Sequence, residues 1–135
     1  MVLRRKAGAV STDIIRTVVV TLPWAPTVNH QYARNRRGGV RLTQEARDFR
    51  VEVLAAWRKA KHPGFGARRV CVVLSLYPPD KRKRDADGVV KSCFDSLQEA
   101  DAFVDDYQIE YFTVWRKAPE PPGRIEVTIG QVLCA

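Results

Sequence analysis

The architecture is set by residues 70–97, which read VCVVLSLYPPDKRKRDADGVVKSCFDSL. The first part, Val70–Tyr77, is an almost continuous apolar run, which predicts a strand covered on both faces. Pro78 and Pro79 end this strand, because proline cannot donate a hydrogen bond to a sheet. Beyond a basic turn, apolar residues recur at helical spacing and predict a helix over residues 86–99. A strand followed by a helix is therefore the central unit of the fold.

The flanking segments supply three more strands and one more helix. β-Branched residues predict a strand over residues 14–22, and apolar side chains at steps of three and four predict a helix over residues 43–60. Two further strands are expected over residues 109–117 and 124–129. The order β-α-β-α-β-β predicts an α+β, two-layer domain, in which a mixed sheet of about four strands carries two helices on one face.

Length and composition indicate one globular domain. A chain of 135 residues is long enough for one core and too short for two ordinary ones. We assign residues 13–135 to this domain and residues 1–12 to a weakly ordered N-terminal extension.

Cys71 and Cys93 fall in apolar patterns without zinc-site spacing, so we expect buried thiols of a reducing cytoplasm. Arg16 interrupts the apolar stretch near the N-terminus, which argues against a signal peptide, and no run is long enough to span a membrane.

The chain is strongly basic, and its positive charge gathers in two predicted loops. Lysine and arginine total 23 against 15 acidic residues, a formal net charge of +8. Such a surface attracts polyanions, although a ribosome-associated or simply soluble basic protein would share it. We expect the loop at residues 27–41 and the turn after Pro79 to hold a nucleic-acid backbone. The residues assigned to this contact are Arg34, Arg36, Arg37, Lys81, Arg82, Lys83 and Arg84.

Carboxylates gather beside the ends of predicted elements, which is unexpected in so basic a chain. Asp85 and Asp87 lie at the start of the predicted helix, and Lys91 follows one turn later. Asp105 and Asp106 precede the next strand. Each pair has an ordinary explanation, as a helix cap, an i,i+4 ion pair or a solvated turn. Together they favour a Mg²⁺ site for phosphodiester hydrolysis, because hard cations take oxygen ligands and activate water, while a lysine offsets developing charge.

Three motifs resemble the core of the RusA family of Holliday junction resolvases. They are Arg84–Lys91, Asp95–Leu97 and Asp105–Ile109, and the opening Thr21–Asn29 is similar to that family's Leu-Pro-rich start. The likeness extends over residues 18–130. It implies a small homodimeric endodeoxyribonuclease of the bacterial or phage cytoplasm, dependent on Mg²⁺ or Mn²⁺. Such an enzyme resolves four-way DNA junctions by paired, symmetric nicks.

The resemblance also assigns roles by position. The implied catalytic residues are Asp85, Asp87, Asp106 and Lys91, and the three carboxylates among them would hold the metal. Asp105 matches an adjacent acid of the family, and we include it among the metal ligands. Asn29, in the family-like opening, joins the residues that we expect to contact DNA.

Two other functions and one geometric question stay open at this point. The acids can be structural in a non-catalytic, structure-specific DNA- or RNA-binding protein, or they can serve a metal-dependent nuclease for flaps and other branches. The geometric question concerns the strands at residues 70–77 and 109–117. If they are parallel, Asp106 begins its strand at the end away from Asp87. A shared metal then requires Asp106 from a partner subunit.

Overall fold

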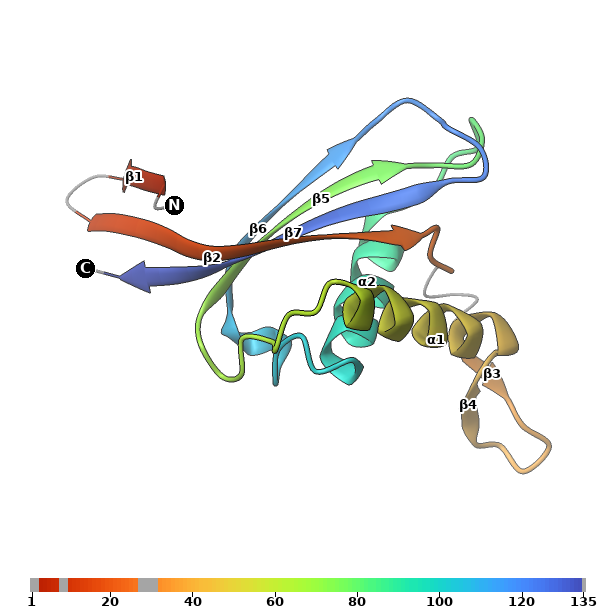
Figure 1. Cartoon of the computed structure of the whole chain (residues 1–135). Coiled ribbons are helices and arrows are strands. Elements are labelled where there is room, and N and C mark those ends of the chain that lie inside the picture. The colour runs from red at the N-terminus through yellow and green to blue at the C-terminus, as the bar shows by residue number, and fades with distance from the viewer. Residues whose placement is uncertain (1–2, 8–9, 27–31, 135) are drawn as a thin grey trace.

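A five-stranded mixed sheet forms the centre of the molecule in the computed structural model, which describes residues 3–7, 10–26 and 32–134 (Figure 1). The strand order in the sheet is β1-β2-β7-β5-β6. Its strands are β1 (Leu3–Ala7), β2 (Val10–Pro23), β5 (Val70–Tyr77), β6 (Ile109–Arg116) and β7 (Arg124–Cys134). β5 pairs antiparallel with β7 and parallel with β6. β6 is the last strand in this order and therefore forms an edge of the sheet.

Two helices and a small hairpin complete the described fold. The helices are α1 (Gln44–Lys59) and α2 (Ala86–Glu99). The hairpin consists of β3 (Tyr32–Arg34) and β4 (Val40–Leu42), and a short 3₁₀ helix, Asp106–Gln108, precedes β6. The Thr43 side chain caps α1 by accepting a hydrogen bond from the Ala46 N–H at 3.2 Å.

These elements confirm the α+β class and the predicted order of the main elements. The strand expected over residues 14–22 is longer and begins at Val10. Within the segment that the sequence assigned to an extension, Leu3–Ala7 form β1, which pairs antiparallel with β2. The β3–β4 hairpin lies in a segment that was expected to be a loop. Backbone pairing of short strands leaves little trace in a polar sequence.

Both helices cover the same face of the sheet, as expected (Figure 1). The sheet contributes Leu22, Leu74 and Val127 to the core, at 1%, 0% and 0% exposure. From the helices, Phe49 of α1 and Leu97 of α2 pack into the same core. Burying large apolar side chains in this way is the main stabilising contribution to such a fold.

The other face of the sheet is open, which corrects the prediction for β5. Val73 and Ser75 on that face are only half-buried, so β5 is covered by helices on one side alone. On β7, Thr128 is the cross-strand partner of Val73, and Glu126 is that of Ser75. The apolar run therefore reflects the position of β5 between two neighbouring strands, and a helix layer on each face was the wrong inference.

Both cysteines predicted to be buried are free thiols in the core. Cys71 is 5% exposed and Cys93 is fully buried. Burial raises the pKa of the Cys93 thiol to about 12, because a thiolate there would lose its hydration. Across residues 3–7, 10–26 and 32–134, no helix has the length and apolar character needed to cross a membrane.

Candidate active site

The loop between β5 and α2 is closed by an ion pair. The Arg84 guanidinium lies 2.7 Å from the Asp80 carboxylate and also donates to the Asp80 and Arg82 carbonyls at 3.3 Å each. Asp80 in turn accepts the Arg82 N–H at 2.9 Å. The hydrogen bond from Arg84, followed by that from the Arg82 backbone, lowers the pKa of Asp80 to about 2. Arg84 also lies over the Trp24 ring, at 5.8 Å.

This arrangement divides the four basic residues of the loop. The Arg84 side chain is only 19% exposed and is engaged within the loop. By contrast, Lys81, Arg82 and Lys83 are exposed. The loop therefore presents three cations to solvent, and Arg84 helps to hold the turn that carries them.

Asp85 and Asp87 stand at the start of α2, as predicted. Asp85 occupies the N-cap position, yet within the described structure its side chain makes no capping hydrogen bond. Asp87 lies in the first turn, and both residues are exposed. The free N–H groups and dipole of a helix start favour negative charge here. The carboxylate of Asp85 is thus not used by the helix, which weakens the ordinary explanation of that residue as a cap.

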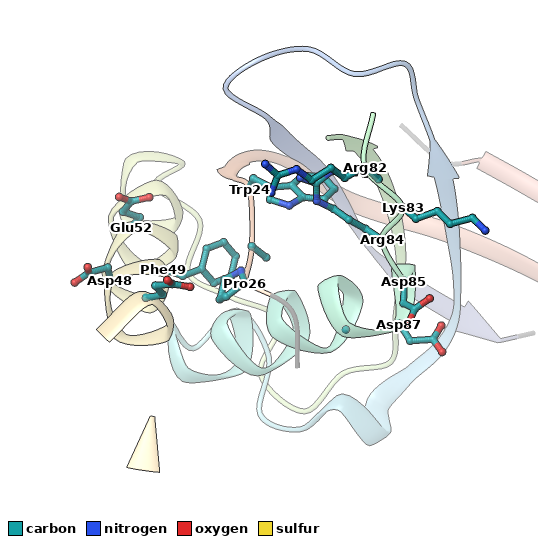
Figure 2. Close-up of a pocket in the computed structure, with 13 residues that line it drawn as sticks. Trp24, Pro26, Asp48, Phe49, Glu52, Arg82, Lys83, Arg84, Asp85 and Asp87 are labelled. Carbon is teal, nitrogen blue, oxygen red and sulfur yellow. Dashed lines mark hydrogen bonds between the residues drawn. The ribbon is translucent and has the colours of Figure 1, made fainter. Parts of the chain in front are cut away.

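Both carboxylates line a groove between α1 and the loop (Figure 2). The groove encloses about 990 Å³. The Asp48 and Glu52 side chains of α1 lie on the side opposite to the two acids, and Trp24 and Pro26 lie between. Arg82 and Lys83 lie above the two acids on the same rim, so carboxylates and cations meet at one opening.

Lys91 lies on α2 and faces a second groove. Its ammonium is 3.4 Å from the Asp95 carboxylate, and its side chain is 57% exposed. This second groove, of about 630 Å³, runs between α2 and β6, and Asp87 and Asp106 line it together with Lys91. Its floor is apolar and includes Phe94, which packs edge-to-face on Phe112 at 5.3 Å.

Asp105 and Asp106 form a turn that Gln108 holds in place. The Gln108 amide oxygen accepts the Val104 and Asp105 N–H groups, both at 3.0 Å. Its amide nitrogen donates to the carbonyls of Gly66 and Arg68 at 2.7 and 2.6 Å. With 9% exposure, this glutamine is one of the few buried polar residues in the described part of the chain.

The two neighbouring acids of this turn affect each other. The pKa of Asp106 is raised, first by a hydrogen bond with the Asp105 side chain and then by desolvation and the Asp105 charge. The nearby Lys91 cation acts in the opposite direction. Two carboxyl groups this close together form a site where added positive charge would be favourable.

Within one described chain, Asp87 and Asp106 line the same groove, yet they lie toward opposite ends of α2. Because β5 and β6 are parallel, Asp87 follows the far end of β5 whereas Asp106 precedes the start of β6. The Asp106 N–H bonds Gln98 at 3.3 Å, near the other end of α2 from Asp87. At about 1.5 Å per residue, roughly 16 Å of helix separates Asp87 from Gln98. Among the described residues, no three His, Cys, Asp or Glu side chains are grouped closely enough to hold a metal ion.

The predicted DNA-contacting arginines of the first loop lie on the β3–β4 hairpin. Arg34, Arg36 and Arg37 are exposed, and the hairpin projects from the start of α1 away from the sheet (Figure 1). The Asn35 side chain organises the tip by accepting the N–H groups of Arg37 at 3.1 Å and Gly39 at 2.8 Å. The remaining predicted residue, Asn29, lies outside the described residues.

Two basic residues that the sequence analysis did not select lie beside the β5–α2 loop. Arg116 and Lys117 line a third groove, of about 470 Å³, together with Lys81 and Lys83. The Lys117 N–H donates to the Leu76 carbonyl at 2.8 Å, which fixes the end of β6 against the end of β5. The signal was the basic pair at the end of a strand, but placing this pair beside the loop required knowing that β5 and β6 are parallel.

Exposed acids at a helix start, framed by cations on an α+β scaffold, are the features of a nuclease that uses a metal ion. The family model for endodeoxyribonuclease RusA matches residues 23–130. The chain is 31% identical over 118 residues to crossover junction endodeoxyribonuclease RusA of Escherichia coli (strain K12), covering 87% of this chain and 98% of the relative. The protein of the same name from Shigella sonnei (strain Ss046) gives the same values, and that of Enterobacteria phage 82 is 30% identical with the same coverage.

The chain therefore belongs to the RusA family. This membership confirms the family predicted from the sequence, and with it the prediction of an endodeoxyribonuclease. The relatives come from bacteria and from a phage.

Proposed function

We propose that this protein is a cytoplasmic homodimer that resolves four-way DNA junctions by a metal-dependent pair of symmetric nicks. The observation that carries the proposal is the pair Asp85 and Asp87 at the start of α2, next to the exposed cations Lys81 to Lys83. The relatives, each named a crossover junction endodeoxyribonuclease, support the choice of substrate. Residues 13–135 would form the nuclease domain.

The donor atoms present suit a hard divalent cation. Asp85 and Asp87 offer carboxylate oxygens that the helix cap does not use, and Mg²⁺, or Mn²⁺ in its place, takes such ligands. When bound, the cation supplies Lewis-acid stabilisation of the phosphate and an activated water. Lys91 would place its ammonium next to the phosphate oxygens and offset the charge that develops on them. The hydrogen bond that Lys91 makes to Asp95 would orient it for this role.

Asp106, with its neighbour Asp105, would complete the site from a second copy of the chain. The support is geometric. Asp87 and Asp106 line one groove of the same chain, but Asp106 lies beside Gln98, near the other end of α2, and no three described acids are grouped closely enough to hold a metal. A twofold axis relates two such copies, and each copy can then give Asp106 to the other's Asp85 and Asp87. A four-way junction has the same symmetry, so two sites can nick opposing strands.

The basic groups would hold DNA on both sides of each site. The β3–β4 hairpin carries Arg34, Arg36 and Arg37, and the loop before α2 carries Lys81, Arg82 and Lys83. Arg116 and Lys117 would extend the second surface, because they line the same groove as the loop. Asn29 and Arg84 remain proposed contacts, although Arg84 is largely engaged with Asp80. Such contacts position the backbone and do not read sequence.

The test compares substrates and metals in one assay. A mobile synthetic four-way junction, a flap and a plain duplex are each incubated with the protein, with Mg²⁺, with Mn²⁺ and with a chelator. The proposal expects paired nicks at symmetric positions in the junction, dependent on metal. Cleavage of the flap alone would favour a branch nuclease, and tight junction binding without cleavage in any metal would favour a non-catalytic binding protein.

A further inference from the structure

Tyr107 is presented to solvent in an unusual way. Its exposure is 92%, the highest of the large hydrophobic residues in the described structure. The next in order, Val51, is 67% exposed. Aromatic rings normally bury most of their surface in a core or an interface, so a ring left open on a folded domain calls for a partner.

The backbone that carries this ring is tightly held. The Tyr107 N–H donates to the Asp105 carboxylate at 2.9 Å, and Asp105 with Gln108 forms a complete capping box around the 3₁₀ helix. On the next residue, the buried Gln108 amide bonds four backbone groups from two segments. A ring on such a support can bind without the cost of ordering a loop, which favours affinity.

The position of the ring connects it with the proposed chemistry. Tyr107 directly follows Asp106, and consecutive Cα atoms are about 3.8 Å apart. A metal ion held by Asp106 would also bind the phosphate that is cut. The sugar and base attached to that phosphate would then lie within reach of the neighbouring ring.

We propose that Tyr107 stacks on a nucleobase at the branch point of the junction, beside the phosphate that is cut. The inference rests on the proposed function, since it takes Asp106 to be at the cleavage site. Every base has a π face, and bases at the exchange point of a junction are the ones least held by stacking, so they are free to accept an aromatic ring. The tyrosine would thereby select branched DNA over plain duplex.

A base fits this surface better than an apolar protein partner. The ring is flanked by two carboxylates, Asp105 and Asp106, and a protein interface that covered it would have to remove both charges from water. A junction arm brings its own compensation, because a divalent cation bound to the acids and to the phosphate neutralises them. Contact between two copies of the chain is the alternative that the experiment must separate.

The first measurement is photocrosslinking, which needs binding but no cleavage. Four-way junctions carry 5-iodouracil either at the branch point or well inside an arm, and the full-length protein binds them in Ca²⁺, which takes the same kind of oxygen ligands as Mg²⁺. We expect the branch-point probe to crosslink to Tyr107, as mapped by peptide mass spectrometry, and the arm probe not to do so. Crosslinking at other residues with none at Tyr107 would overturn the inference even if the protein resolves junctions.

The second measurement uses three variants and Mg²⁺. Tyr107→Leu should weaken junction binding roughly tenfold while duplex binding is unchanged, whereas Tyr107→Phe should retain the wild-type preference because the ring is kept. Val104→Ala removes another exposed apolar side chain, 63% exposed and on the same turn, and serves as the matched control. Light scattering on each variant gives the oligomeric state.

The outcomes separate the two proposals. Dissociation of the dimer by Tyr107→Leu would assign the ring to contact between copies and overturn base stacking. Wild-type cleavage together with unchanged junction preference in Tyr107→Leu would also overturn base stacking. A wild-type protein that crosslinks through Tyr107 but cleaves no junction would leave the stacking role intact and refute the proposed resolvase activity.

Discussion

Arg84 and Asp80 are joined by an ion pair of 2.7 Å that closes the loop between β5 and α2. The two residues are four positions apart in the sequence, the spacing of ion pairs along a helix, although this loop is not helical. Arg84 contacts the Asp80 carboxylate, two backbone carbonyls and the Trp24 ring from this position. Arg82 also lies near the Asp80 carboxylate, at 3.7 Å, but its side chain is 83% exposed, whereas Arg84 is held within the loop.

The first prediction concerns this ion pair and pH. The pKa of Asp80 is lowered from 3.8 to about 2, so the contribution of the pair to stability is present above pH 4 and is lost as pH falls through 2. In Arg84→Gln, the pKa of the Asp80 carboxyl should rise toward its ordinary value, because its main hydrogen-bond donor is gone while the Arg82 N–H and charge remain. Carboxyl carbon NMR shifts measure both midpoints. Equal midpoints in the two proteins would show that the pair does not exist in solution.

The second prediction concerns the acids at the helix start. Asp85→Asn and Asp87→Asn should each abolish junction cleavage while binding persists or tightens, since each change removes an anionic ligand and repulsion toward phosphate. Glu52→Gln is the matched control, because Glu52 lines the same groove and loses the same charge. Gel assays of cleavage and binding measure both properties. Near-wild-type cleavage by the Asp87 variant would refute the site.

The third prediction separates catalysis from a simple ion pair at Lys91. Lys91→Ala should reduce single-turnover cleavage roughly a hundredfold, as expected for loss of a charge stabiliser. Lys91→Arg should restore only part of it, because a planar guanidinium does not replace a compact ammonium. Asp95→Asn removes the same salt bridge but keeps the lysine, and should be much milder. Equal losses in Lys91→Ala and Asp95→Asn would assign Lys91 a structural role.

The fourth prediction tests whether Asp106 acts across the dimer. Asp87→Asn and Asp106→Asn are each inactive alone, but a mixed dimer contains one site with both native acids if Asp106 is supplied by the partner. Mixing equal amounts, with subunit exchange, should restore about a quarter of the wild-type sites, each in a dimer with a single active centre. The product should be a single nick. If both acids serve within one chain, the mixture stays inactive.

The fifth prediction distinguishes the basic residues proposed to contact DNA from exposed basic residues elsewhere on the surface. Neutralising Arg116 and Lys117 together should weaken binding to junctions of any sequence. It should also reduce the slope of log affinity against log salt by about 0.9 for each phosphate that the protein no longer neutralises. Neutralising Arg58 and Lys59, which are exposed on α1, should change the slope much less. Fluorescence anisotropy at several salt concentrations measures the slope. A change of sequence preference at constant slope would instead indicate base reading.

Local patterns predicted most of the elements because they depend on neighbouring residues only. Helix periodicity identified α1 and α2, and the proline pair after Tyr77 correctly ended β5. The buried cysteines followed from the same apolar patterns. The sequence placed Asp85 and Asp87 at a helix start for the same reason, since a helix boundary is a local feature.

Features that depend on pairing were not predictable in this way. The side-chain pattern does not reveal whether β6 runs parallel or antiparallel to β5, because a strand has the same alternation in either orientation. The parallel arrangement brings Arg116 and Lys117 to the basic loop and places Asp106 near the end of α2 opposite to Asp87. The coverage of β5 on one face and the strand β1 in the expected extension are differences of the same kind.

By itself, the sequence determined the two helices and the four main strands, the chemical character of the acids and cations, and the family to which the chain belongs. The tertiary structure alone decided which of those residues share a surface. It brought Arg116 and Lys117 to the loop that carries Lys81 and Lys83, and it left Tyr107 open on a turn that Gln108 holds. The physical reason is that secondary structure follows from local sterics and periodicity, whereas the grouping of side chains follows from long-range strand pairing and core packing.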